Sequence, residues 1–192
     1  MENIKLIYDY CKPIADIKLE ELLPLEGKIK EVQFNPDEVI FFEGEHYEST
    51  IFIKSGLLKK LYTTTSGKEY IKEFVWEGQS TTPYYSILTQ APTTYTLKAI
   101  EKTDAIIVDF STLQSLADES YSWLLILKSI LDFNFINREK REMQLLKFTA
   151  TQRYLDFIES NPKLFKRLKK QDIAKYLGIT PTTLSRIRAE NP

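Results

Sequence analysis

The chain has 192 residues, a net charge of −1 and 43% hydrophobic residues, which is typical of one or two globular domains. Its longest apolar run, residues 123–127, ends at Lys128 and is far shorter than the ~20 residues that a membrane span needs. The first residues lack a secretory pattern, and Cys11 has no second cysteine with which to pair. We therefore expect a cytoplasmic protein with no membrane partner.

Composition also limits the chemistry. Because His46 is the one histidine, the chain cannot supply a histidine metal triad, and one thiol cannot hold an iron–sulfur cluster. The sequence offers no nucleophile–base pair, which argues against an enzyme built on a cupin-like jelly roll. We expect a protein that is not an enzyme and that has neither a metal site nor a cofactor.

The predicted elements begin with a short helical segment over residues 1–24. Between Gly27 and Phe110, runs of β-branched and aromatic residues are separated by turn signals at short intervals. This spacing favours a β-sandwich or jelly-roll barrel whose antiparallel strands have one face in water. The predicted strands are residues 28–34, 39–42, 50–54, 57–63, 69–76, 95–100 and 105–110.

The pattern becomes helical from Ser111, with a short helix and then a long one between Leu113 and about Leu146. The apolar stripe of the long helix is wider than a coiled-coil seam, so it must be covered on two sides. One side would pack on the barrel and the other on a second subunit, although a helix buried only in its own chain has the same pattern. The residues predicted to pair two chains are Trp123, Leu124, Leu127, Leu131 and Asn134.

A further helix is predicted over Ala150–Glu159. Thr149 and Gln152 have the spacing of a capping box at its start, and Asn161-Pro162 would end it. The whole chain is therefore predicted to be α+β. Its predicted parts are a helix plus jelly roll (1–112), a helical connector with the pairing helix (113–147) and a C-terminal helical domain (148–192).

Residues 170–188 have the pattern of a helix-turn-helix. Ile173, Ala174 and Leu177 share one face of a short first helix. Gly178 supplies the positive φ that ends this helix, and Thr180 followed by Pro181 can start the next one. Leu184 and Ile187 would face inward, so the start and outer face of the second helix could enter a major groove.

Charge is distributed unevenly, in agreement with that motif. Residues 145–192 contain ten Lys or Arg and four Asp or Glu, a net charge of +6, so residues 1–144 carry −7. A basic C-terminal part beside an acidic remainder is typical of a nucleic-acid-binding module joined to another domain. We therefore expect double-stranded DNA as a partner.

The order of these elements resembles the Crp/Fnr family of bacterial transcription regulators over almost the whole chain. The resemblance is carried by residues 41–45 (FFEGE), 51–56 (IFIKSG), 77–79 (EGQ), 102–106 (KTDAI) and 171–188. Residues 150–154 (ATQRY) and 176–188 are similar to the branch common in Bacteroidetes. The resemblance implies a DNA-binding homodimer, with RNA polymerase and an unidentified small-molecule effector as further partners.

The resemblance also implies how the second helix would read DNA. Arg186 can donate two hydrogen bonds to a guanine, whereas contacts to phosphates carry no sequence information. The chain ends soon after this helix, where the family usually continues into a two-stranded wing, so little or no wing is expected. The predicted base-contacting residues are Pro181, Thr182, Ser185 and Arg186. The predicted phosphate-contacting residues are Lys169, Lys170, Lys175, Thr180, Thr183 and Arg188.

The effector site departs from the family pattern. Members that bind cyclic nucleotides hold the phosphate with a helix start and an arginine, but residues 80–96 contain no charged side chain, and Tyr95 falls where that arginine would be. Because a buried phosphate without a counter-charge is costly, we expect no control by cyclic AMP. The pocket either holds another ligand or is filled by its own side chains, the candidates being Thr82, Tyr84, Tyr85, Tyr95 and Thr96.

Two functions remain open. The first is a dimeric transcription regulator that binds specific DNA sequences. The alternative is a sensor or adaptor with the cyclic-nucleotide fold, whose helix-turn-helix contacts proteins in place of DNA. Affinity for random duplex that falls steeply with added salt would separate the two, because only DNA binding releases counterions from phosphates.

Overall fold

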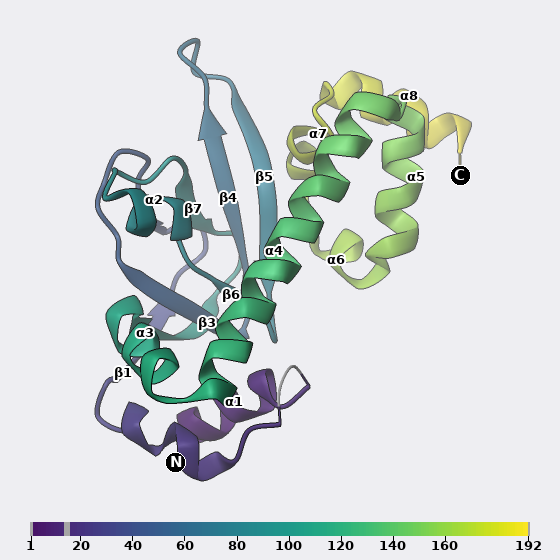
Figure 1. The fold of residues 1–192 in the computed structure, drawn as a ribbon. Helices are drawn as coiled ribbons and strands as arrows, with labels where there is room; N and C mark the ends of the chain where they lie inside the picture. Colours follow the sequence, from purple (N-terminus) through teal and green to yellow (C-terminus); the bar gives the residue numbers. More distant parts are fainter. Residues whose placement is uncertain (1, 14–15, 192) are drawn as a thin grey trace. The chain divides into compact units, whose positions relative to one another are not determined.

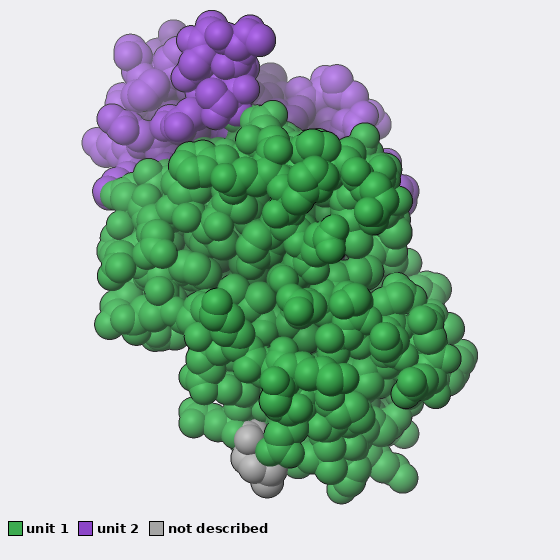
Figure 2. All heavy atoms as spheres, turned by 90° about the vertical axis from the view of Figure 1, so that its left-hand side faces the viewer, with its two compact units in different colours: residues 1–62, 73–132 green, residues 63–72, 133–192 purple. Residues whose placement is uncertain are grey.

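The computed structural model describes residues 2–13 and 16–191, apart from the side chain of Phe133. It divides into two compact units, which Figure 2 colours separately: unit 1 is residues 1–62 and 73–132, and unit 2 is residues 63–72 and 133–192. The predicted α+β class, with a β-sandwich followed by helices, is confirmed (Figure 1).

The β-sandwich of unit 1 consists of two four-stranded antiparallel sheets. The strand order is β1-β8-β3-β6 in one sheet and β2-β7-β4-β5 in the other. The strands are β1 (Ile29–Phe34), β2 (Val39–Phe41), β3 (Ser49–Ser55), β4 (Leu57–Thr63), β5 (Glu69–Trp76), β6 (Ser80–Thr81), β7 (Thr96–Ala99) and β8 (Thr103–Asp109). All seven strands predicted from the sequence are present, and the two-residue β6 was not predicted.

Strand β3 of the first sheet is buried on both faces over residues 50–53. On β3, Ile51 and Ile53 point into the sandwich, where they pack with residues such as Leu58 and Leu97 of the second sheet. Phe52 points the other way, toward the helices. Successive residues of a strand face opposite sides, so an unbroken apolar run is what a strand covered on both faces requires.

Helices cover the outer face of that sheet. They are α1 (Glu2–Cys11), the 3₁₀-helix η1 (Leu19–Leu25), α3 (Phe110–Glu119) and the first turns of α4 (Tyr121–Lys147) (Figure 1). Ile4, Ile7 and Cys11 form the buried stripe of α1, as their helical spacing predicts. Trp123 is only 2% exposed, and its Nε1 donates to the Glu21 carbonyl at 3.2 Å, which fixes the start of α4 against η1.

Unit 2 contains the end of α4 and four short helices. These are α5 (Ala150–Ser160), α6 (Pro162–Arg167), α7 (Lys170–Leu177) and α8 (Pro181–Glu190). The predicted capping box is confirmed, because the Gln152 N–H donates to Thr149 Oγ1 at 3.2 Å and the Thr149 N–H donates to Gln152 Oε1 at 2.9 Å. α6 was not predicted; Pro162 both ends α5 and occupies the first position of α6, where its missing N–H is no loss.

Candidate nucleic-acid interface and barrel interior

α7 and α8 form the predicted helix-turn-helix. Gly178 has φ +70° at the C-terminal end of α7. Thr180 Oγ1 accepts the Thr183 N–H at 3.1 Å, and Pro181 occupies the first turn of α8. The sequence signals for the turn and for both helix ends are therefore confirmed, because each signal acts through local backbone geometry.

The inner face of this motif is buried. Five apolar side chains of α7 and α8 are each at most 3% exposed: Ile173, Ala174, Leu177, Leu184 and Ile187. Since side chains three or four residues apart share a helix face, burying Leu184 and Ile187 directs the residues between them outward. These outward residues are the ones that the major groove of DNA could contact.

All four predicted base-contacting residues are exposed on α8: Pro181, Thr182, Ser185 and Arg186. They lie within the first two turns of the helix. Their side chains combine a guanidinium with two hydroxyls, which can donate to base edges or to phosphates. The structure therefore brings these predicted residues together on one surface.

The predicted phosphate-contacting residues are in more varied surroundings. Lys169, Lys170 and Thr180 are exposed. Thr180 and Thr183 share a hydroxyl–hydroxyl hydrogen bond of 2.9 Å. Lys175 Nζ lies 2.5 Å from a carboxylate oxygen of Glu69, on the segment of residues 63–72 that belongs to the same unit. The guanidinium of Arg188 lies 5.8 Å from the centre of the Phe165 ring.

The residues predicted to pair two chains also differ in burial. Trp123 lies in the core of unit 1, and Leu127 packs against that core. Trp123 therefore has no surface to offer a second chain, because its own chain covers both sides of the ring. Leu124 is 50% exposed, Leu131 is half-buried and Asn134 is exposed, so the uncovered part of the stripe begins at Leu124.

The five candidate pocket residues make separate contacts. Tyr95 is buried in the inner core beside Phe41 and Leu97. Tyr85 is 61% exposed on α2 (Tyr84–Thr89), a helix that the sequence did not predict. The other three are held by neighbours: Thr82 by Thr50 (Oγ1–Oγ1 2.8 Å), Tyr84 by the edge of Phe110 (5.5 Å between ring centres) and Thr96 by the Glu43 N–H (3.0 Å).

An ion pair between a buried lysine and a partly exposed glutamate, which the sequence analysis missed, lies next to Tyr95. Lys60 of β4 is 6% exposed, and its Nζ lies 2.7 Å from Glu73 Oε2 of β5 and 5.6 Å from the centre of the Tyr95 ring. Burial by itself lowers the pKa of Lys60, but the nearby Glu73 carboxylate raises it to a net value above the ordinary one. Burial also raises the pKa of Tyr95, which stays a neutral phenol.

The alternation of side chains along β4 could have revealed that Lys60 is buried. Lys59 and Lys60 are adjacent on β4, so they must point to opposite faces of the sheet. Lys60 shares its face with Leu58, which lies in the inner core. The pair places one positive and one negative charge together, so the barrel holds a cation that is already neutralised.

Replacing Glu73 with glutamine should destabilise unit 1 by about 2 kcal/mol, because a buried ammonium then lacks its counter-charge. The double variant Lys60→Met/Glu73→Gln should regain most of this loss. Urea unfolding followed by tryptophan fluorescence measures both variants, since Trp76 and Trp123 lie in unit 1. A double variant no more stable than Glu73→Gln would contradict the unpaired ammonium as the cause of the loss.

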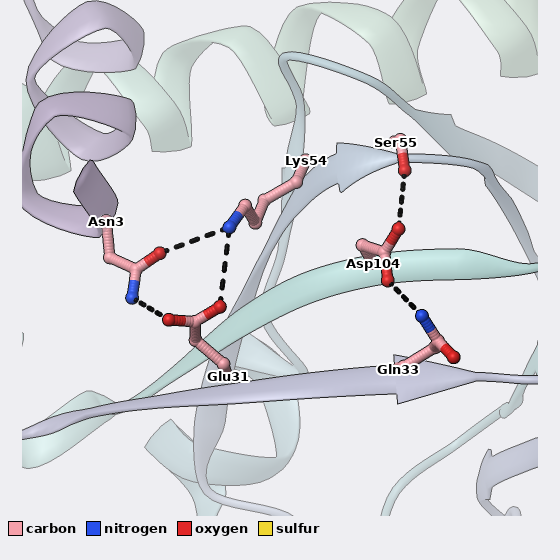
Figure 3. A network of polar contacts seen from close by, with 6 residues as sticks. All are labelled: Asn3, Glu31, Gln33, Lys54, Ser55 and Asp104. Atoms are coloured by element: carbon pink, nitrogen blue, oxygen red, sulfur yellow. Dashed lines mark hydrogen bonds and ion pairs between the residues drawn. The ribbon is translucent and has the colours of Figure 1, made fainter.

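A polar groove of about 520 Å³ lies on the outer side of the β1-β8-β3 sheet, away from the residues considered so far. Figure 3 shows its hydrogen bonds. Asn3 Nδ2 donates to Glu31 at 2.7 Å, and Lys54 Nζ contacts the same carboxylate at 3.4 Å. Hydrogen bonds from Gln33 and Ser55 lower the pKa of Asp104. The hydrogen bond from Asn3 ties α1 to β1, the edge strand of this sheet.

Other chemistry is limited in the described part of the chain. Residues 2–13 and 16–191 contain no group of three or more His, Cys, Asp or Glu side chains placed to hold a metal ion. Over the same residues, no helix combines the length and apolar character needed to cross a membrane. Cys11 is 1% exposed, and burial raises the pKa of its thiol to about 12, which makes it a packing residue with little thiolate.

The β-sandwich is similar to a known family of domains. Residues 31–120 match the family of cyclic nucleotide-binding domains. No curated protein matches the sequence. The fold of the whole chain is similar to several solved structures, although sequence identity is low.

Three of these structures cover most of both chains. FixK2 from Bradyrhizobium japonicum has 22% identity and a TM-score of 0.75, and covers 84% of this chain and 83% of its own. CLP from Xanthomonas campestris, a global regulator responsive to c-di-GMP, has 13% identity, a TM-score of 0.73 and coverages of 90% and 91%. A protein from Eubacterium rectale assigned to the Crp/Fnr family of transcriptional regulators has 14% identity, a TM-score of 0.73 and coverages of 91% and 83%.

These likenesses agree with the resemblance carried by the sequence motifs, while the Bacteroidetes branch stays a prediction. The chain is therefore similar to cyclic nucleotide-binding domains over residues 31–120, and its overall fold is similar to that of a solved Crp/Fnr regulator.

Proposed function

We propose that the chain is a transcription regulator of the Crp/Fnr type, which binds specific DNA sequences as a homodimer and is not controlled by cyclic AMP. The observation that carries this proposal is the helix-turn-helix, whose inner face is sealed while Thr182, Ser185 and Arg186 are exposed at the start of α8. The excess of positive charge in residues 145–192 supports a nucleic-acid partner.

The proposed dimer forms through α4. Its uncovered apolar side chains include Leu124 and Phe135, 50% and 57% exposed, and a spacing of about three helical turns places them on one side of the helix. A two-fold pair would place one α8 in each of two successive major grooves, ~34 Å apart on a pseudo-palindromic site. RNA polymerase would be a further partner at promoters.

The proposed independence from cyclic AMP rests on the barrel interior. Residues 80–96 offer no cation for a phosphate. Lys60 is already neutralised by Glu73, and Tyr95 packs among apolar side chains of the inner core. A cyclic nucleotide would have to break that ion pair or remain without a counter-charge, and both are costly. A barrel interior that is filled by its own side chains fits these observations better than a pocket for a ligand other than cyclic AMP.

The decisive experiment measures binding of the purified protein to random duplex DNA at several salt concentrations. A regulator should bind in dilute salt and lose affinity steeply as salt rises, with a linear log–log dependence. Cyclic AMP should leave that affinity unchanged. Protein that ignores duplex DNA in dilute salt would contradict the proposal and favour the sensor or adaptor.

Arg186→Ala should reduce discrimination at one base step of each half-site by about 1–3 kcal/mol, because the guanidinium can pair with two acceptors of a guanine. Lys170→Ala is the matched control, since it removes one exposed positive charge at the start of α7 and should weaken all sequences alike. Sites selected from a random library by each protein make the comparison. If the Arg186→Ala protein keeps the wild-type sequence preference, Arg186 does not contact a base specifically.

A further inference from the structure

Two arginines meet the C-terminal end of α7, the first helix of the helix-turn-helix. Arg141, on α4, donates from Nη2 to the Tyr176 carbonyl. Arg153, on α5, donates from Nε to the Leu177 carbonyl at 3.2 Å and from Nη1 to the Phe148 carbonyl at 2.7 Å. Tyr176 and Leu177 are the last two residues of α7, directly before the turn at Gly178.

This position suits a guanidinium. The last carbonyls of a helix lack partners within the helix and carry its negative partial charge, so a cation that donates to them stabilises the helix end. The guanidinium of Arg141 also lies 4.2 Å from the centre of the Tyr176 ring. Burial lowers the pKa of Arg141, which nevertheless remains protonated. Arg141 thus contacts both the backbone and the side chain of one residue.

The two arginines connect α7 to different helices. Arg153 belongs to α5, which packs against α7 in any case. Arg141 belongs to α4, which runs without interruption from Tyr121 to Lys147 and carries the exposed apolar stripe. Leu145 of α4 lies near the same turn, since its Cδ2 would be 4.0 Å from a Cβ placed on Gly178.

The end of α7 also determines where α8 begins. Gly178 and Ile179 both donate their N–H groups to the Ala174 carbonyl, and Thr180 then caps α8. Only three residues therefore lie between Leu177 and Pro181. A displacement of the end of α7 must carry the start of α8 with it, because the connection is too short and too strongly hydrogen-bonded to absorb the change.

We propose that Arg141 is a positioning residue that fastens the end of α4 to the turn of the helix-turn-helix. This contact fixes the end of α7, and with it the start of α8, so that its loss should loosen the DNA-reading helix and lower DNA affinity. This inference rests on the proposed function. It assigns to Arg141 a role that the exposed cations of the motif do not have, since its Nη2 donates to a carbonyl of the protein itself.

The test compares Arg141→Met with Arg138→Met, which removes the same charge from an exposed position less than one turn earlier on α4. Amide hydrogen exchange at Gly178 and Ile179 reports the turn without DNA, and duplex binding reports α8. Arg141→Met should speed exchange at these amides and weaken binding to a selected site, each by about tenfold, as expected for losing a charged hydrogen bond. Arg138→Met should change neither by more than about threefold. Sedimentation should give the same species for both variants.

Arg141→Lys is a second variant that keeps the test decisive if Arg141→Met does not fold. It keeps the charge and a hydrogen-bond donor but loses the planar stacking on Tyr176. Its exchange at the turn should fall between wild type and Arg141→Met. Unchanged exchange in Arg141→Met would overturn the link, and so would faster exchange with DNA binding equal to that of Arg138→Met. Wild-type protein that binds no duplex would contradict the proposed function alone, since the exchange measurement still decides whether Arg141 holds the turn.

Discussion

Replacing Gly56 with alanine should lower the free energy of unfolding of unit 1 by about 4 kcal/mol. Gly56 joins β3 to β4 with φ +104°, a conformation that L-residues adopt only with strain. A Cβ at this position would lie 2.4 Å from Thr103 Oγ1 and 2.6 Å from the Lys102 carbonyl oxygen. Strain and overpacking each cost about 1–3 kcal/mol, and the backbone of β8 cannot move aside without breaking its ladder.

Gly44→Ala provides the control for this prediction. Gly44 has φ +93°, but no atom lies within 4 Å of the position that a Cβ would take there, so the substitution costs strain alone, about 1–2 kcal/mol. Both variants are measured by urea unfolding with tryptophan fluorescence, which reports unit 1. Equal losses for the two variants would show that the close approach of residues 102–103 does not matter for stability.

The elements that sequence predicted well are those specified by local rules. The seven strands follow from alternation and turn residues, and the start of α5 follows from Thr149 and Gln152, which are close in sequence. The helix-turn-helix was predicted almost residue by residue, because caps, turn glycine and inner apolar positions all belong to one short segment. Local geometry leaves such segments few alternatives.

Features that depend on distant partners were missed. The apolar stripe of α4 did not reveal that η1 covers Trp123, because periodicity shows which residues share a face and not what packs on it. Lys60 follows another lysine in the sequence, and its partner Glu73 lies on the next strand. Arg141 belongs to a strongly polar stretch, residues 137–142, and donates to a carbonyl 35 residues later. No spacing rule in the sequence relates such residues.

The effector prediction was affected in the same way. Its five residues come from the stretch that corresponds to the phosphate-binding segment of the family, and the structure places Tyr85 at the surface and Tyr95 in the core. The absence of charge along residues 80–96, in contrast, is a property of the sequence alone. That absence, together with the neutralised Lys60, carries the argument against cyclic AMP more firmly than any single candidate residue.

Leu131→Glu should convert the proposed dimer into monomers at micromolar concentration. In a two-fold pair each substitution occurs twice, so two carboxylates would be buried where two apolar side chains met. At about 2 kcal/mol or more for each buried charge, the dissociation constant should rise at least about 1,000-fold. Sedimentation velocity over a range of concentrations measures this change directly. The half-buried position of Leu131 means that tryptophan fluorescence should confirm an intact unit 1.

Asn137→Glu is the matched control, because Asn137 is exposed and lies six residues away, on another side of α4. It adds the same charge to the same helix and should leave the dimer intact. Leu131→Gln separates lost apolar contact from buried charge and should weaken pairing less than Leu131→Glu does. If Leu131→Glu sediments as wild type does, α4 does not pair the chains through this side. A monomeric variant should in turn lose most of its affinity for a two-half-site operator, since each α8 then binds its groove alone and the gain from linking two sites disappears.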